Sequence, residues 1–250
     1  MIRGLIFCSL RPSKPCPSYC YSGNYKLSSM AADEISEAKS KLRLEIKSKI
    51  KLLTEEYKIK QTFIITKRLV KHPDFQNAER IAIYVNMKNE VGTYDILKEA
   101  FAGNKQVFIP LVVGENMKMV RLNSFDDLKT MPKTKWGIIQ PLESDNREDC
   151  LESGGVQYVV VPGVAFTSSG LRLGHGRGYY DRFLAKNDEI RGSRCVTVGL
   201  GFDAQIVPDL PTTERDFRLT WVVSPAMCSL TSKYDEVPDP LPRPPEPFHI

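Results

Sequence analysis

The chain of 250 residues is long enough to bury the core of a full-sized domain, and its 42% hydrophobic and 26% charged residues are ordinary for a globular protein. No run approaches the eighteen or so apolar residues of a membrane-spanning helix, so we expect no membrane partner. The net charge of +5 does not indicate a nucleic-acid surface, because residues 1–32 hold four basic and no acidic residues and the rest carries only +1.

The cysteines show no sign of a disulfide framework or a structural zinc site. Three of the six lie in residues 1–32, and the others, Cys150, Cys195 and Cys228, stand far apart along the chain. Neither arrangement has paired metal-ligand spacing. We therefore expect a reducing compartment and a cytoplasmic location.

Both ends of the chain are expected to lie outside the domain, which we place at residues 33–230. The basic leader at residues 1–32 fits a mitochondrial targeting segment within residues 1–30 and a disordered extension about equally well. Met30 would serve as the start of a shorter cytoplasmic form. Residues 231–250 contain six prolines, which remove backbone donors and favour extended chain, so we interpret this segment as a tail.

The first elements of the domain are two predicted helices. Leu42, Ile46 and Ile50 recur at helical spacing and predict an amphipathic helix over residues 34–53. Thr54, followed by two glutamates, then predicts the N-cap of a second helix that runs to about Lys71.

Strands and helices alternate along the rest of the domain. Short β-rich runs predict strands at residues 81–85, 107–109, 158–161 and 195–198, and helical patterns lie at residues 93–102 and 178–186. Continuous apolar strands separated by helices are typical of a sheet buried on both faces. We therefore predict an α/β fold: a single three-layer domain with a largely parallel sheet covered by helices on both faces.

A glycine-rich loop follows the third predicted strand. Its sequence is Gly170-Leu171-Arg172-Leu173-Gly174-His175-Gly176-Arg177-Gly178-Tyr179-Tyr180-Asp181. Glycines without Cβ let backbone amides approach an anion, and the start of the following helix adds free N–H groups and the positive end of its dipole. The loop therefore indicates a phosphate site, with a ligand-free glycine turn as the alternative.

Two common phosphate-binding fingerprints do not match this loop. A dinucleotide fingerprint needs a third glycine where Tyr179 stands. A P-loop needs Gly-Lys followed by Ser or Thr, which occurs nowhere in the chain.

The run Arg-Leu-Gly-x-Gly-x-Gly-Tyr-Tyr-Asp after Pro-Gly-x-x-Phe resembles the signature of 5-formyltetrahydrofolate cyclo-ligases. The resemblance extends from about Ala38 to about Val223 through further segments in the same order: Lys39 to Arg43, Met87 with Glu90, Leu128 to Trp136 with Gln140 and Pro141, and Glu214 to Asp216. It implies that ATP phosphorylates the formyl oxygen of 5-formyltetrahydrofolate. Ring closure by N10 then yields 5,10-methenyltetrahydrofolate, ADP and phosphate.

The resemblance also implies an ATP site. Lys39 and Arg43 lie four residues apart on one helical face and match the pair that holds the phosphates, although Lys47 continues the row as a solvated basic face would. The remaining ATP contacts are Arg172, Gly174, His175, Gly176, Arg177, Gly178, Tyr179 and Tyr180. Of these, Arg177 and Tyr180 are the candidate catalytic residues.

A folate pocket and a magnesium site follow from the same resemblance. The folate residues are Val85, Met87, Glu90, Trp136, His175, Arg177 and Tyr179. The Glu90 carboxylate would accept from the amino-pyrimidinone edge of the pterin, whereas composition alone places Met87 in the core. Asp181 and Asp216 match the carboxylates for Mg²⁺, which usually takes one or two from the protein. Asp181 is otherwise explained as an acid at a helix start.

Three residues depart from the pattern of the family. Arg177 stands where animal enzymes usually have lysine, which keeps the charge but changes the donor geometry. His175 stands where Arg or Tyr is common, and a neutral histidine still donates one hydrogen bond. Thr167 replaces a frequent aspartate that we interpret as a turn former.

Two other functions compete with this hypothesis. One is a noncatalytic, nucleic-acid-binding relative of the same fold, and the other is an ATP-using enzyme that acts on another formylated or acidic metabolite. The chain has no aromatic RNA-recognition run and its domain is nearly neutral, so we expect no nucleic-acid partner. We expect a monomer whose partners are 5-formyltetrahydrofolate and ATP, with Mg²⁺ as the cofactor.

Overall fold

A seven-stranded sheet organises the computed structural model, which describes residues 32–134, 137–213 and 216–230. The strands are β1 (Arg80–Ile83), β2 (Gln106–Val113), β3 (Asn116–Leu122), β4 (Tyr158–Val161), β7 (Val196–Leu200), β8 (Trp221–Val223) and β9 (Cys228–Leu230), in the order β3-β2-β1-β4-β7-β8-β9. The five central strands pair in parallel, and β3 and β9 close the two edges antiparallel.

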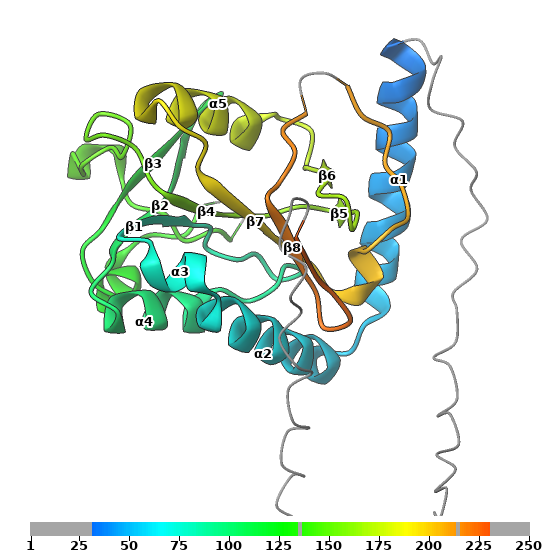
Figure 1. Ribbon diagram of the computed structural model, residues 1–250, viewed down its shortest axis with the longest axis horizontal. Helices are drawn as coiled ribbons and strands as arrows, with labels where there is room; N and C mark the ends of the chain where they lie inside the picture. Colours follow the sequence, from blue (N-terminus) through cyan, green and yellow to red (C-terminus); the bar gives the residue numbers. More distant parts are fainter. Residues whose placement is uncertain (1–31, 135–136, 214–215, 231–250) are drawn as a thin grey trace, which may run out of the picture.

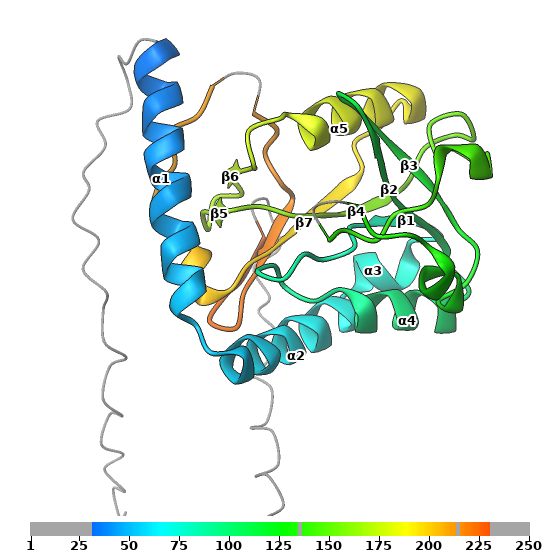
Figure 2. The same cartoon turned by 180° about the vertical axis from the view of Figure 1, so that it is seen from behind.

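Helices cover both faces of this sheet (Figure 1). They are α1 (Ala32–Leu52), α2 (Glu55–Lys71), α3 (Pro73–Asn77), α4 (Tyr94–Ala102) and α5 (Tyr179–Arg191), with the short 3-10 helices η1 (Asp126–Thr130), η2 (Glu143–Asp145) and η3 (Asp203–Gln205). Helices α2, α3 and α4 lie on one face and α5 on the other, in both views (Figure 2). The prediction of a three-layer domain with a largely parallel sheet is confirmed.

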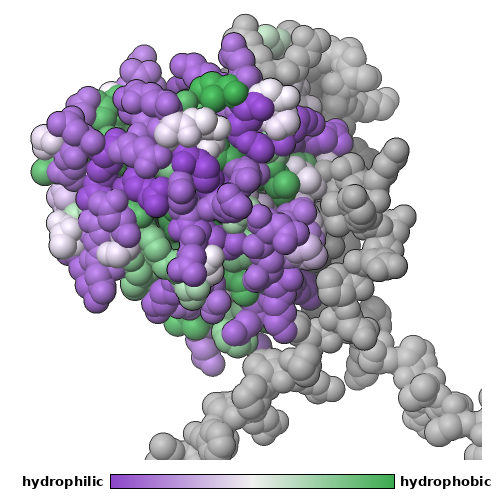
Figure 3. Space-filling view, turned by 60° about the vertical axis from the view of Figure 1, so that its left-hand side comes forward, coloured by the Kyte–Doolittle hydropathy of each residue, from purple (hydrophilic) through white to green (hydrophobic). Residues whose placement is uncertain are grey.

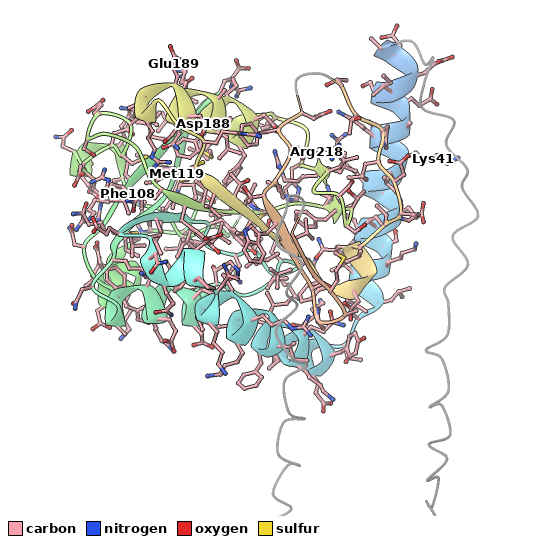
Figure 4. All side chains as sticks on the ribbon, viewed as in Figure 1. Lys41, Phe108, Met119, Asp188, Glu189 and Arg218 are labelled. Atoms are coloured by element: carbon pink, nitrogen blue, oxygen red, sulfur yellow. The ribbon has the colours of Figure 1, made fainter. Side chains whose placement is uncertain are left out.

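The alternation of side chains along each strand separates two cores. On β1, Ile81 and Ile83 pack toward the core under α2 and α4, whereas Ala82 belongs to the core under α5. Phe108 on β2 and Met119 on β3, labelled in Figure 4, belong to this second core. Both faces of the sheet are buried, which explains why the strands read as continuous apolar runs.

The predicted helices are present, and one of them, α5, is longer than predicted. Thr54 caps α2 by accepting a hydrogen bond from the Tyr57 N–H at 3.2 Å, and the helix ends at Lys71 as expected. Helix α5 continues beyond the predicted residues 178–186 and ends where Gly192 adopts φ +64°, a left-handed C-cap. The sequence pattern missed α3, the two edge strands, the parallel strand β8 and two further strands of two residues each, all of which depend on tertiary contacts.

Helix α1 stands apart from the sheet layers, against a two-stranded hairpin of β5 (Ala165–Phe166) and β6 (Arg172–Leu173) (Figures 1 and 2). Its buried residues, Leu42, Ile46 and Ile50, join the core that also holds Leu173. Lys41 points away from the sheet (Figure 4). The hairpin therefore lies between α1 and the sheet, which brings the glycine loop close to α1.

The order of the strands sets where a ligand would bind. From β1 the chain moves outward through β2 and β3, then returns to β4 on the other side of β1 and continues to β7, β8 and β9. Such a reversal leaves a crevice outside the carboxyl ends of the two central strands. Residues 84–92 follow β1 and residues 162–178 follow β4, so both predicted ligand loops lie at this crevice.

The face seen in Figure 3 is mostly hydrophilic, with apolar residues in small separate groups. None of the described helices is long and apolar enough to cross a bilayer. The leader at residues 1–31, Trp136 and the proline-rich tail at residues 231–250 lie outside the described residues.

Candidate functional site

Free backbone N–H groups gather at the start of α5. Gly178 is the N-cap of this helix, and no side chain caps it. The N–H groups of Tyr179, Tyr180 and Asp181 have no intrahelical acceptor, and no hydrogen bond between described residues supplies another one. Because these donors and the helix dipole point the same way, the turn favours an anion.

Arg43 of α1 lies across the glycine loop. Its Nε donates to the Gly174 carbonyl at 2.8 Å. A Cβ added to Gly176, which has φ +106°, would lie 3.6 Å from the Arg43 guanidinium carbon. Burial lowers the pKa of Arg43 from its ordinary value, and the nearby Asp216 carboxylate acts against this shift. The loop therefore needs glycine at position 176 for its backbone, and the Arg43 guanidinium lies within van der Waals range of that position.

Lys39 of α1 pairs directly with Asp216, which lies in the connection between β7 and β8. The Lys39 ammonium is 2.6 Å from Asp216 Oδ2, and the Thr213 N–H and hydroxyl donate to the same oxygen at 2.6 and 3.1 Å. Burial opposes ionisation of Asp216, but the hydrogen bonds from Lys39 and Thr213 outweigh it and lower the pKa. Lys47 is exposed, so the basic row does not continue into the site.

The second predicted magnesium ligand, Asp181, lies beside the first. Its Oδ1 accepts from Arg172 at 2.7 Å and from the Phe217 N–H at 3.3 Å, and Phe217 directly follows Asp216. Arg172 is buried and also donates to the Pro162 carbonyl at 3.3 Å. Two carboxylates and two cations therefore meet at one corner beside the start of α5.

This corner fits a magnesium ion that is completed by phosphate oxygens. Within residues 32–134, 137–213 and 216–230, no group of three or more His, Cys, Asp or Glu could hold a metal. Hydrogen bonds between described residues reach only Oδ1 of Asp181 and only Oδ2 of Asp216, which leaves the second oxygen of each for a ligand. Mg²⁺ typically binds one or two carboxylates together with substrate phosphates.

Glu90 joins the loop after β1 to the glycine loop. Its Oε2 accepts from the Met87 N–H at 2.8 Å, and its Oε1 lies 3.3 Å from His175 Nε2. The Glu90 side chain is 10% exposed. His175, a departure from the family pattern, therefore contacts the acid that we expect to bind the pterin. Val85 is 4% exposed and packs in the core, so it offers little surface here, and Met87 is half-buried.

Two phenols, Tyr84 and Tyr180, feel the charge of the Glu90 carboxylate. Burial raises the pKa of Tyr180, and Glu90 raises it further, while Arg172 partly offsets the shift. Burial and Glu90 also raise the pKa of Tyr84, whose hydroxyl donates to the Val91 carbonyl at 3.0 Å. These surroundings favour the neutral form of both phenols, in which the Tyr180 hydroxyl can donate a hydrogen bond.

Arg177 and Tyr179 face the opposite side of the loop, toward the turn between β2 and β3. The Tyr179 hydroxyl accepts from Arg177 at 3.3 Å and donates to the Gly114 carbonyl at 3.0 Å. These two side chains line an open pocket together with Glu115, Asn116 and Arg182. The structure thus divides the predicted residues. Lys39, Arg43 and Asp216 lie on the α1 side of the loop, and Arg177 lies on the side of the β2–β3 turn.

Several residues of this region were missed from the sequence. Arg182 directly follows Asp181 in the first turn of a predicted helix, so its cation was a usable signal. No sequence signal marks Thr213 or the turn at residues 115–116, because their positions in the site depend on how the strands pair. The Thr167 hydroxyl accepts from the Leu171 N–H at 3.1 Å and so closes its own turn, in keeping with the role expected for the usual aspartate.

Comparison with known proteins gives one consistent result. The model of the 5-formyltetrahydrofolate cyclo-ligase family matches residues 35–225. A 5-formyltetrahydrofolate cyclo-ligase from Mus musculus is 38% identical over 78% of this chain and 97% of its own length, and a probable one from Caenorhabditis elegans is 33% identical over 76% and 93%. The solved structure of a 5,10-methenyltetrahydrofolate synthetase from Aquifex aeolicus superposes with a TM-score of 0.65 at 27% identity, covering 80% of this chain and 96% of that one.

Proposed function

The chain belongs to the 5-formyltetrahydrofolate cyclo-ligase family and is an enzyme of that class, and we propose that it uses ATP and Mg²⁺ to convert 5-formyltetrahydrofolate to 5,10-methenyltetrahydrofolate, ADP and phosphate. The observation that supports this activity best is the glycine loop. Arg43 clamps it on the α1 side, and the uncapped start of α5 follows it.

The chemistry of the substrate explains why ATP is needed. The formyl oxygen at N5 is a poor leaving group, and the formamide carbon is a poor electrophile. Transfer of the γ-phosphoryl group to this oxygen makes it a leaving group, so that N10 can attack the carbon, close the five-membered ring and release phosphate. The protein has to align the two substrates and neutralise charge during the transfer.

The α1 side of the loop suits the nucleotide. Lys39 supplies a point charge and Arg43 a planar fork for phosphate oxygens, and the N–H groups at the start of α5 add neutral donors. Arg172 and the other loop residues complete the proposed ATP site. Asp181 and Asp216 would hold Mg²⁺, which neutralises charge on the phosphate oxygens when it is bound.

The crevice side suits the folate. Glu90 Oε1 lies 3.3 Å from His175 Nε2, and the donors on the pterin edge can replace His175 at this oxygen. Tyr180, held neutral beside Glu90, can donate to the formyl oxygen or to phosphate. Met87, His175, Arg177 and Tyr179 would contact the rest of the substrate, and Val85 would support the pocket from the core.

A spectroscopic assay tests this function. Purified protein with MgATP and 5-formyltetrahydrofolate should form a product with the near-ultraviolet absorbance of the methenyl compound, together with one ADP per product. Excess EDTA should stop the reaction, and added Mg²⁺ should restore it. Folded protein that forms neither product would favour the noncatalytic relative. ATP hydrolysis that depends on another formylated or acidic metabolite would favour the second alternative.

For the oligomeric state, the partners and the location of the protein, we keep the expectations from the sequence. We propose a monomer that acts without nucleic acid in the cytoplasm. The targeting interpretation of residues 1–30 concerns a segment outside the described residues.

A further inference from the structure

Arg182, in the first turn of α5, connects three segments around the glycine loop. One terminal nitrogen of its guanidinium donates to the Arg177 carbonyl at 2.9 Å, and the other donates to the Glu115 carbonyl at 3.2 Å. The guanidinium also lies 5.5 Å from the centre of the Tyr179 ring. A single cation therefore ties the loop to the turn between β2 and β3.

The contact with Arg177 fixes the direction of a donor in the loop. The Arg177 carbonyl and the Gly178 N–H belong to one trans peptide, in which the two groups point in opposite directions. Because Arg182 holds the carbonyl, the Gly178 N–H points away from Arg182. No hydrogen bond between described residues uses this N–H, which directly precedes the three free donors of the first turn of α5.

The missing side chain of Gly178 leaves room for this contact. It has φ +63°, and a Cβ added to it would lie 3.1 Å from the Arg182 guanidinium. At the other end of the loop, Arg43 holds the Gly174 carbonyl at 2.8 Å in the same manner. Two arginines thus bind carbonyls at the two ends of the loop and orient the peptides to which these carbonyls belong.

We propose that Arg182 is a positioning residue for the phosphate-binding loop: it orients the Arg177–Gly178 peptide so that the Gly178 N–H faces the transferring phosphoryl group. This inference rests on the proposed function. Arg182 is exposed, and water can solvate both carbonyls if it is removed, so its contribution lies in orientation and much less in stability. A donor with a fixed direction gains most where charge develops during transfer.

Three variants test the role of Arg182. Arg182→Ala removes both contacts, and Arg182→Lys keeps the charge without the planar fork. Lys186→Ala is the matched control, because it removes an exposed cation one turn further along α5. We expect kcat to fall by about ten- to a hundredfold in Arg182→Ala, with a smaller change in the KM for ATP. Arg182→Lys should recover part of the rate, and Lys186→Ala should match the parent.

Melting temperature and ATP affinity by calorimetry complete the experiment. The proposal is overturned if Arg182→Ala keeps the kcat of the parent, or if Lys186→Ala loses as much. It is also overturned if the rate and the melting temperature fall together in both Arg182 variants, because that result assigns Arg182 a structural role. A parent protein that binds ATP but forms no methenyl product would instead refute the proposed function. In that case, a lower ATP affinity in Arg182→Ala than in the parent would still support a positioning role of Arg182 in the phosphate-binding loop.

Discussion

Lys39 and Asp216 form an ion pair at 2.6 Å although 177 positions separate them in the chain. The pair joins α1 to the connection between β7 and β8, beside the proposed phosphate site. Its side chains are 14% and 24% exposed. Each member is expected to serve a different part of MgATP, so the ion pair keeps both side chains in place before the nucleotide arrives.

Lys39→Met should therefore lower turnover by about a hundredfold, the scale of a positioned charge that faces phosphate. The free energy of unfolding should change by about 1 kcal/mol, because a partly exposed ion pair contributes little. Steady-state kinetics and urea unfolding measure the two effects. Lys47→Met, which removes an exposed lysine from the same helix, should match the parent, and equal losses in the two variants would contradict the assignment.

Arg177→Ala tests the side of the loop that faces the β2–β3 turn. Arg177 is exposed and hydrogen-bonds the Tyr179 hydroxyl, so its loss should change stability by less than about 1 kcal/mol. Turnover should fall by about a hundredfold or more if this cation stabilises the transferred phosphate. MgATP should also raise the melting temperature less than in the parent. Full activity with full stabilisation by nucleotide would remove Arg177 from the catalytic assignment.

Gly176→Ala separates the function of the loop from backbone strain. At φ +106° an alanine is strained, and relief of this strain would displace the loop, so both stability and turnover should fall. Gly192→Ala is the matched control: Gly192 has φ +64° with nothing within 4 Å of its added Cβ. It should lose about 1–2 kcal/mol of stability at full turnover. Equal turnover in the two variants would show that the loop does not approach a ligand.

Asp127→Asn tests the pH dependence of stability. Arg147 donates to Asp127 Oδ1 at 2.9 Å, and this hydrogen bonding is the main reason why the pKa of Asp127 is lowered. A lowered pKa stabilises the folded state above the unfolded-state value of about 3.9, and the contribution is lost as the pH falls through the folded-state value. The parent should be more stable than the variant by about 1–3 kcal/mol at pH 7. Urea unfolding should show this difference shrinking in acid, and a constant difference would refute the ion pair.

A chain that starts at Met30 tests the boundary of the domain. Helix α1 begins at Ala32, so every described element is retained. The shortened protein should unfold at the same urea concentration and turn over at the same rate as the full chain. Loss of either property would place the leader within the domain.

Local patterns in the sequence were sufficient for the layers of the fold. Helical spacing of Leu42, Ile46 and Ile50 marks the buried face of α1, and Thr54 satisfies a free N–H at the start of α2. Such signals act within one or two turns of chain, so a single sequence displays them. The glycine loop was also visible, since its glycines and cations lie within ten residues. Strands β3, β8 and β9 were missed because their stability comes from a partner strand.

The contacts between loops were decided by tertiary structure. Nothing in the sequence brings Glu90 to His175, or Arg182 to the Glu115 carbonyl, because these partners meet only where the order of the parallel strands reverses. The same reversal buries Val85 in the core and turns Arg177 toward the β2–β3 hairpin. The residue types determined which chemistry the chain can perform. Which groups face one another was determined by strand order, because backbone pairing sets the positions of the loops before any side chain makes its contact.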